Sequence, residues 1–260
     1  MSARELPRAP WLLVLAGHDP TGGAGIDADR EAAAAFGVRA TCIVTALTRQ
    51  DGRTVHAIGA REPAAWLADA RAVLAPPPAA VKTGLLPGAA HLRALLALAD
   101  LLPAALPIVV DPLLAAGGGE VFLDEEGVEV LLAEVLPRAV HLVPNLLEAA
   151  RLTGLAPADL AADRGARLAA AGALVARGAR SVFLKGGHGR EDPVQDLLLV
   201  PGEAPLWLSH PRVPGLGLHG SGCRTASAFA AQLARGVPPP AAAAAAGRWI
   251  ARRIAAAAGS

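Results

Sequence analysis

The sequence predicts a three-layer α/β/α fold with a mostly parallel central sheet. Short apolar runs such as Trp11–Ala16 show no alternation of apolar and polar residues, which indicates strands that are buried on both faces. Ala-rich stretches with helical patterns, such as Asp159–Arg177, lie between those runs. Alternation of strands and helices is typical of parallel strands joined by helical crossovers.

Each predicted strand is a short apolar segment that ends at Gly, Pro, Asp, Asn or another polar residue, and each predicted helix is rich in Ala and Leu, which are good helix formers. The expected strands are Trp11–Ala16, Thr41–Leu47, Val81–Thr83, Ile108–Asp111, His141–Val143 and Ser181–Lys185. The expected helices between them are Gly25–Phe36, Pro63–Leu74, Gly88–Leu101, Asp124–Leu136, Asn145–Leu152 and Asp159–Arg177.

The last third of the chain departs from this alternation. Gln195–Val200 and Leu206–Val213 flank the turn sequence Pro201-Gly202-Glu203, so we expect an antiparallel hairpin there. Two helices, Gly222–Arg235 and Pro240–Ala258, are expected to end the chain. We find no long linker or repeat, and therefore expect one domain over residues 1–260.

Composition and charge exclude several classes of protein. Hydrophobic residues make up 53% of the 260 residues, which excludes a disordered chain. The formal net charge of +1 gives no basic surface for nucleic acid. Cys42 and Cys223 lie far apart, which excludes a disulfide framework and favours reduced thiols. Trp11–Gly17 is too short to be a signal peptide, and Pro and Asp interrupt Ala94–Val110. We expect a cytoplasmic protein with no membrane or nucleic-acid partner.

Aromatic residues make up only 3% of the chain, and Tyr is absent. The core must therefore consist of Ala, Val, Ile and Leu. Most Phe and Trp residues fall away from the predicted polar edge of the sheet, so we expect a flat ligand to meet backbone and aliphatic walls there.

Polar and glycine-rich segments follow the predicted strands. These segments are Gly17-His18-Asp19, Thr48-Arg49-Gln50-Asp51, Lys82-Thr83-Gly84, Asp111-Pro112, Pro144-Asn145 and Lys185-Gly186-Gly187-His188. In parallel sheets, ligands bind outside the carboxyl ends of the strands. Although any single turn is polar and glycine-rich, six such segments together favour a binding site at that edge.

The segment Gly17–Asp29 combines a glycine-rich loop with a helix start, an arrangement that brings backbone N–H groups to a polar ligand. Gly23–Ala28 also matches the dinucleotide fingerprint GxGxx(G/A). Its first glycine comes roughly six residues after the strand, whereas that fingerprint needs a tight turn, so we disfavour a dinucleotide fold.

A second glycine-rich turn, His219–Cys223, precedes a predicted helix near the end of the chain. Free N–H groups and the helix dipole favour an anion at such a turn. We expect the pKa of Cys223 to be lowered there, although a glycine turn with a buried small thiol is the plainer alternative. A catalytic pairing of Cys223 with His219 as base finds no support in this spacing.

Pro144–Glu148 has two interpretations. Asn145 and Glu148 have the spacing of a capping box at a helix start, or they could hold magnesium directly or through water. Lys185 ends an apolar strand beside two glycines, a position that suits contact with a phosphate.

Taken together, these segments resemble the hydroxymethylpyrimidine/phosphomethylpyrimidine kinases of thiamine biosynthesis, within the ribokinase-like superfamily. The resemblance runs from Leu12 to about Ile254 in the family's order. Its blocks are AGHDPTGGAGIDAD (Ala16–Asp29), VTALTRQ (Val44–Gln50), VKTGLL (Val81–Leu86), VVDP (Val109–Pro112), LVPNLLEA (Leu142–Ala149), LKGGH (Leu184–His188) and HGSGC (His219–Cys223).

The resemblance implies a ribokinase-like fold, a small pyrimidine substrate, ATP with Mg2+, and a homodimer. It also implies roles for particular residues. The pyrimidine would contact Gly17, Asp19, Ala24, Asp29, Gln50 and Leu85, while Gly220, Ser221, Gly222 and Cys223 would form the catalytic anion hole. ATP would contact Lys185, Gly187 and Asn145, and the metal would be held by Asp111 and Glu148.

The chain departs from the family pattern at several places. Ala115–Gly118 lacks the family's usual lysine, and Gly215–Leu218 replaces a polar approach to the anion hole. Arg224 stands where a small hydroxyl residue usually follows the cysteine, and would either add positive charge or obstruct the site; Leu85 replaces a methionine.

Three functions therefore stay open on the sequence. The first is phosphorylation of 4-amino-5-hydroxymethyl-2-methylpyrimidine and of its monophosphate. The second is phosphorylation of pyridoxal or a related ring alcohol, and the third is pyrimidine binding by a weakly active paralogue. Asp29 and Gln50 favour an aminopyrimidine over pyridoxal.

Overall fold

The central sheet runs through the whole molecule and has the expected parallel character. The computed structural model describes residues 9–116, 119–213 and 218–258. In those residues the sheet has nine strands in the order β3-β2-β1-β4-β5-β6-β7-β8-β9. Strands β2, β1, β4, β5, β6 and β7 pair in parallel, whereas β3, β8 and β9 pair antiparallel at the two edges. The predicted three-layer α/β/α class is confirmed.

The element bounds agree with the sequence pattern to within a few residues in most places. The strands are β1 Trp11–His18, β2 Arg39–Gln50, β3 Val55–Ala60, β4 Ala80–Thr83, β5 Ile108–Val110, β6 His141–Leu142, β7 Ser181–Leu184, β8 Val194–Leu199 and β9 Leu206–His210. The α-helices are α1 Gly25–Ala35, α2 Pro63–Ala72, α3 Ala89–Ala99, α4 Glu125–Val130, α5 Leu146–Thr153, α6 Pro157–Ala162, α7 Arg164–Ala176, α8 Ser221–Ala234 and α9 Pro239–Ala258.

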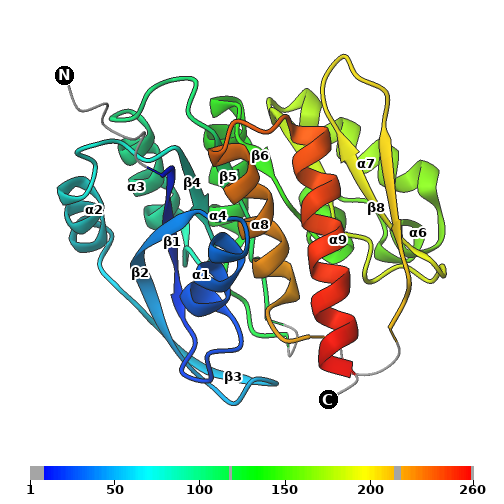
Figure 1. Ribbon diagram of the computed structural model, residues 1–260, viewed down its shortest axis with the longest axis horizontal. Helices are drawn as coiled ribbons and strands as arrows, with labels where there is room; N and C mark the ends of the chain where they lie inside the picture. Colours follow the sequence, from blue (N-terminus) through cyan, green and yellow to red (C-terminus); the bar gives the residue numbers. More distant parts are fainter. Residues whose placement is uncertain (1–8, 117–118, 214–217, 259–260) are drawn as a thin grey trace, which may run out of the picture.

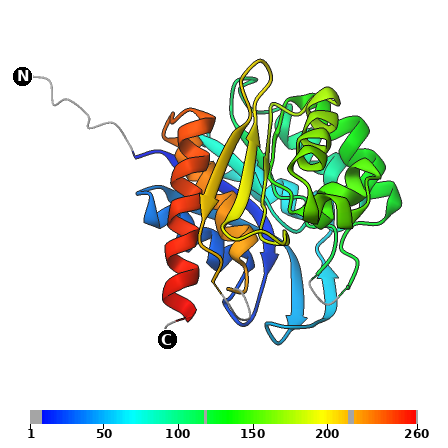
Figure 2. The ribbon, with the colours of Figure 1, turned by 90° about the vertical axis from the view of Figure 1, so that its right-hand side faces the viewer.

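Helices cover both faces of the sheet (Figures 1 and 2). Leu13 and Leu15 of β1 pack into the apolar cluster shared with α2, α3, α4, α5 and α7. Leu12 and Val14 pack into the cluster shared with α1, α8 and α9 on the other face. Because both faces of β1 are buried, its sequence shows no alternation. Helix α8 packs against α1 and α9 through a surface rich in Ala, so the core needs few aromatic residues.

Three features differ from the sequence prediction. Strand β3 was not expected, because its residues are largely exposed and the hairpin that joins it to β2 has no apolar face to mark it. The expected helix over Asp159–Arg177 is two helices, because Asp163 caps α7 by accepting hydrogen bonds from the N–H groups of Gly165 and Ala166. The expected helix over Asp124–Leu136 continues beyond α4 as a π-helical turn, Leu131–Val135, and a 3-10 turn, Leu136–Arg138.

None of the helices in the described ranges is long and apolar enough to cross a membrane. The antiparallel pair β8 and β9 confirms the hairpin expected around Pro201-Gly202-Glu203.

Candidate active site

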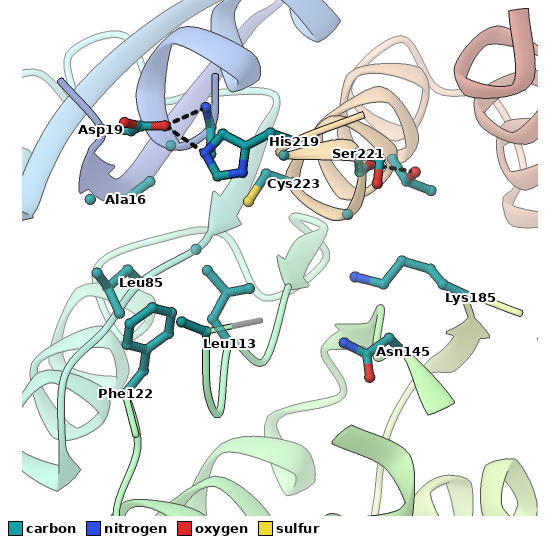
Figure 3. Close-up of a pocket in the computed structure, with 18 of the residues that line it drawn as sticks. Ala16, Asp19, Leu85, Leu113, Phe122, Asn145, Lys185, His219, Ser221 and Cys223 are labelled. Carbon is teal, nitrogen blue, oxygen red and sulfur yellow. Dashed lines mark hydrogen bonds and ion pairs between the residues drawn. The ribbon is translucent and has the colours of Figure 1, made fainter. Parts of the chain in front are cut away.

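One large cavity lies at the carboxyl ends of the parallel strands, where the sequence placed the site. It has a volume of about 760 Å³ and is lined by residues from β1, β2, β4 and β8, from the segment after β7 and from the start of α8. At one end, Leu85, Leu113 and Phe122 lie together, and at the other end are Lys185 and Asn145 (Figure 3). Cys223 lies between these two groups, with its sulfur pointing into the cavity (Figure 3).

The structure brings most of the candidate residues to this cavity. Those that line it are Gly17, Asp19, Ala24, Gln50, Leu85, Asn145, Glu148, Lys185, Gly187, Gly220, Ser221, Gly222 and Cys223. Asp29 and Asp111 lie outside its lining. Gly215, Leu216 and Gly217 of the altered approach to the anion hole lie outside the described residues, as do Gly117 and Gly118. Ala116, near which the family's lysine is missing, lines the cavity.

The loop after β1 is shaped by the carboxylate of Asp19. Its Oδ1 accepts hydrogen bonds from the N–H and the hydroxyl of Thr21, both at 2.8 Å, and its Oδ2 accepts from Ala24 N at 2.9 Å. His219 Nε2 also lies 2.9 Å from Asp19 Oδ2. Burial alone would raise the pKa of Asp19, but these hydrogen bonds and His219 lower it, so the side chain is a carboxylate. Asp19 therefore joins the loop after β1 to the turn before α8.

The turn before α8 is a glycine turn that leads directly into a helix, as the sequence predicted. Gly220 adopts φ 72°, a left-handed conformation that favours glycine, and α8 begins directly after it at Ser221. The N–H groups of the first turn of a helix have no partner within the helix and attract negative charge. A Cβ built on Gly222 would lie 3.2 Å from Lys185 Nζ, so the lysine ammonium stands beside this turn.

The expected lowering of the Cys223 pKa is wrong. Burial raises the pKa of the Cys223 thiol to about 12, although the positive charge of Lys82 acts in the opposite direction. The side chain sits in the third position of α8 and is 7% exposed, so it has lost the hydration that a thiolate needs. Cys223 is therefore a neutral thiol at neutral pH.

The end of the cavity that holds Lys185 and Asn145 contains a buried cluster of opposite charges. Lys185 Nζ donates to Asp111 Oδ1 at 2.8 Å. Burial raises the pKa of Glu148 to about 7, and the charge of Lys185 acts in the opposite direction. Asn145 Oδ1 accepts from Glu148 N at 2.9 Å and Glu148 Oε2 accepts from Asn145 N at 2.7 Å, so the capping-box interpretation is confirmed. This arrangement leaves Glu148 in the cavity wall as well.

We tested whether these residues fit a magnesium ion. The second oxygen of Asp111, Oδ2, is buried without a hydrogen-bond partner, and the charges of Asp111 and Glu148 interact. Mg2+ is commonly held by one or two carboxylates together with water and substrate phosphates. Within the described ranges, no group of three or more His, Cys, Asp or Glu residues is arranged to hold a metal alone. The donor set of Asp111 and Glu148 thus fits an ion that arrives with a nucleotide.

The expected contact of Asp29 with the substrate is corrected by its position. Asp29 is 0% exposed, and its Oδ1 accepts hydrogen bonds from Lys82 Nζ and from the hydroxyl of Ser227, both at 2.7 Å. Burial raises the pKa of Asp29, and the positive charge of Lys82 acts in the opposite direction. The distance of 2.7 Å between Lys82 Nζ and Asp29 Oδ1 is that of a buried ion pair. Asp29 therefore holds Lys82 in the cavity wall instead of facing the ligand space.

The apolar end of the cavity would suit a flat ring. Gly17 packs against Leu85, where an added Cβ would lie 3.0 Å from Leu85 Cδ2. Gln50 lines this part of the cavity, and its Nε2 donates to Thr48 Oγ1 at 2.8 Å. Phe122 also lines this end. The expectation of walls made only of backbone and aliphatic side chains is therefore wrong, because the loop after β5 folds back and brings an aromatic ring to the cavity.

Arg224 neither lines nor obstructs the cavity. Its guanidinium bonds to Glu31 and to the backbone carbonyls of Gly23 and His219, and Arg224 itself is not among the residues that line the cavity, although His219 is. Lys82 and Phe122 were given no role from the sequence, and the contact of His219 with Asp19 was not predicted. Lys82 stands in the resemblance block VKTGLL, and His219 opens HGSGC, so the motifs held a signal for both without indicating their partners.

Comparisons with known proteins agree with this geometry. Residues 19–259 match the family described as Phosphomethylpyrimidine kinase. The chain is 38% identical to the hydroxymethylpyrimidine/phosphomethylpyrimidine kinase of Streptomyces coelicolor, over 87% of this chain and 82% of that protein. It is also 38% identical to the thiamine biosynthesis bifunctional protein ThiED of Geobacter sulfurreducens, over 95% of this chain but only 50% of that longer protein. Among solved structures, pyridoxal kinase from Staphylococcus aureus in complex with AMP-PCP superposes with a TM-score of 0.85 at 27% identity, covering 95% of this chain and 88% of that one.

Proposed function

This chain belongs to the phosphomethylpyrimidine kinase family, and from that membership we propose that it transfers the γ-phosphoryl group of ATP to 4-amino-5-hydroxymethyl-2-methylpyrimidine and then to its monophosphate, as a step of thiamine biosynthesis. The chain is a phosphotransferase of ribokinase-like fold. The observation that supports the proposal most is the placement of Lys185 beside the Gly220–Cys223 turn, in a cavity whose other end is apolar and flat.

The pyrimidine is proposed to lie at the apolar end, between Leu85 and Phe122. Gly17, Ala24 and Gln50 would supply the backbone and amide groups that recognise its ring nitrogens and amino group. The hydroxymethyl oxygen would then point toward the turn before α8. The thiol of Cys223 orients that oxygen as a neutral hydrogen-bonding group, because its pKa of about 12 leaves it protonated at neutral pH.

ATP is proposed to occupy the opposite end. Lys185, Gly187 and Asn145 would contact its phosphates, and the S. aureus pyridoxal kinase complex with AMP-PCP supports nucleotide binding in this fold. Asp111 and Glu148 would hold Mg2+, which supplies positive charge that neutralises the phosphate oxygens.

In the transfer, the substrate oxygen forms a bond to the γ-phosphorus as the bond from that phosphorus to the bridging oxygen of ADP breaks. The N–H groups at the start of α8 and the ammonium of Lys185 stabilise the charge on the three oxygens of the transferring group. The hydroxyl proton leaves late, when the new bond is largely formed, and passes to an oxygen of the transferred phosphoryl group. Positioning by Cys223 and its turn thus supplies most of what the reaction requires.

The proposal is tested by coupled release of ADP with the hydroxymethylpyrimidine, its monophosphate and pyridoxal as separate substrates. We expect turnover near about one per second on at least one pyrimidine, and a lower kcat/KM for pyridoxal. The Cys223→Ala variant, prepared in the same way, controls for contaminating kinases. The absence of turnover on both pyrimidines would contradict the proposal. A higher kcat/KM for pyridoxal than for the pyrimidines would instead favour the alternative function, that of a pyridoxal kinase.

The pyrimidine monophosphate tests the second transfer separately. The lysine absent near Ala116 would have added positive charge near the phosphates, so we expect a lower kcat/KM for the monophosphate than for the alcohol. Tight binding of pyrimidine by calorimetry without turnover would indicate the weakly active paralogue.

Two further properties are proposed from the family resemblance. A homodimer is supported by the open edge of the sheet at β3 and by Leu47 of β2, which is 56% exposed; light scattering of the purified chain tests it.

A cytoplasmic location would keep Cys42 and Cys223 as the free thiols observed, and fractionation of the source cells tests that.

A further inference from the structure

Arg224 stands beside the proposed catalytic cysteine but takes no part in the cavity. It follows Cys223 in the first turn of α8 and is 6% exposed. Successive residues of a helix point about 100° apart, so Cys223 faces the cavity while Arg224 faces α1.

The guanidinium of Arg224 bonds to three acceptors from three segments. Nη1 donates to Gly23 O at 2.6 Å and to His219 O at 2.8 Å, and Nε donates to Glu31 Oε2 at 2.7 Å. Gly23 belongs to the loop that we propose to hold the pyrimidine, and His219 belongs to the turn that we propose to hold the transferring phosphoryl group. A single side chain therefore bridges the two halves of the reaction site.

The two bridged segments are in direct contact. A Cβ added at Gly23 would collide with the ring of His219, and one added at Gly220 would collide with Gly23 O. The pair His219–Asp19 crosses the same junction. Displacement of the pyrimidine loop would thus change the turn before α8 directly.

Glu31 fixes the guanidinium from the side of α1. Its other oxygen, Oε1, accepts from Arg253 Nε of α9 at 2.7 Å. The hydrogen bonds and charges of Arg224 and Arg253 lower the pKa of Glu31 against the effect of burial, so the carboxylate is charged. The donors lie on two separate nitrogens of one planar group, Nε and Nη1, and the single nitrogen of a lysine ammonium would not match that geometry.

We propose that Arg224 is a positioning residue that locks the pyrimidine loop, Asp19–Gly25, to the turn His219–Gly222, so that the pyrimidine oxygen and the anion cradle keep a fixed separation. The inference rests on the proposed function for its kinetic consequence. Its structural content, the coupling of the two segments, stands without it.

The test compares Arg224→Met with Arg253→Met. Both variants remove one partner of Glu31, but Arg253 contacts neither segment in the hydrogen bonds described. We measure kcat and KM for the pyrimidine and for ATP, and amide hydrogen exchange of residues 19–25 and 219–223. For Arg224→Met we expect kcat/KM for the pyrimidine to fall at least about tenfold, since charge-assisted hydrogen bonds are lost, with exchange faster in both segments. For Arg253→Met we expect both measurements to stay within about twofold of the parent.

Arg224→Lys keeps the charge beside Glu31 and should recover only part of the loss; it also replaces Arg224→Met in the comparison if that variant fails to fold. Equal kinetics and exchange in Arg224→Met and Arg253→Met would overturn the inference, as would a rise in the ATP KM alone, which would assign Arg224 to phosphate. If the parent turns over neither pyrimidine, the proposed function fails while the exchange measurement still decides the coupling.

Discussion

The variant Asp29→Asn distinguishes two roles for Asp29. The family resemblance implies a contact with the substrate, whereas the structure shows a buried ion pair with Lys82. The substitution removes the negative charge that lies 2.7 Å from Lys82 Nζ, where both side chains are 0% exposed. Breaking a buried ion pair on one side costs about 3–5 kcal/mol, because the remaining charge is left without compensation. In a chain of 260 residues, with an unfolding entropy of about 2.1 cal/mol/K per residue, that loss lowers Tm by about 5–9 °C.

Urea and thermal unfolding followed by circular dichroism measure this loss, and steady-state kinetics measure the pyrimidine KM in parallel. We expect the unfolding free energy of Asp29→Asn to fall while the KM changes less than about threefold, since Asp29 offers no exposed atom to the ligand. The double variant Asp29→Leu, Lys82→Met removes both charges and should recover most of the stability. An Asp29→Asn protein as stable as the parent, with a KM raised tenfold or more, would refute the reasoning and return Asp29 to the substrate.

Three further predictions concern the cavity itself. Cys223→Ala should lower kcat about 100-fold with little change in pyrimidine KM, whereas Cys223→Ser should stay within about tenfold; equal activity of the alanine variant with the parent would contradict the orienting role. Because the pKa of Glu148 is raised to about 7, kcat/KM of the parent should rise as pH increases through about 7, when the carboxylate forms. Glu148→Gln should be slower and show no such rise, and a rise that persists in it would belong to another group. Phe122→Ala should raise the pyrimidine KM about tenfold in the ADP-release assay and Phe122→Leu less, with the ATP KM unchanged; a uniform effect on both substrates would place Phe122 outside the ring site.

The sheet and the position of the site could be predicted because both follow from local patterns. Leu12 to Leu15 are apolar without interruption, and that alone indicates a strand buried between two layers. The rule that ligands bind at the carboxyl ends of parallel strands then located Gly17 and Lys185 at one cavity. Strand β3 carries no such pattern, since it is an exposed edge strand held by its pairing with β2.

The partners of the charged residues could not be predicted, because they depend on contacts between distant parts of the chain. Asp29 and Lys82 lie on α1 and β4, and each would suit a ligand when judged alone. Only the packing of α1 against β1 and α8, and of α8 against β4, shows that they meet below the cavity. Phe122 could not be predicted for a related reason. The hydrogen bond from its N–H to Leu114 O folds the loop after β5 back toward the ring site, and no sequence pattern indicates that contact.

Cys223 shows how magnitudes decide between two opposing effects at one position. The sequence places the thiol at a helix start, where the dipole and free N–H groups contribute about 0.3–1 kcal/mol, or less than one pKa unit. Burial of an ionisable group shifts its pKa by up to about 3–5 units. The helix start can be recognised in the sequence, but the burial of the thiol cannot, so the sequence predicts a lowered pKa. In the structure, burial raises the pKa of Cys223 to about 12. A thiol that stays protonated cannot accept the proton of the substrate hydroxyl. The site must therefore depend on the placement of Lys185, the α8 turn and the substrate oxygen, which is the geometry that Arg224 is proposed to keep.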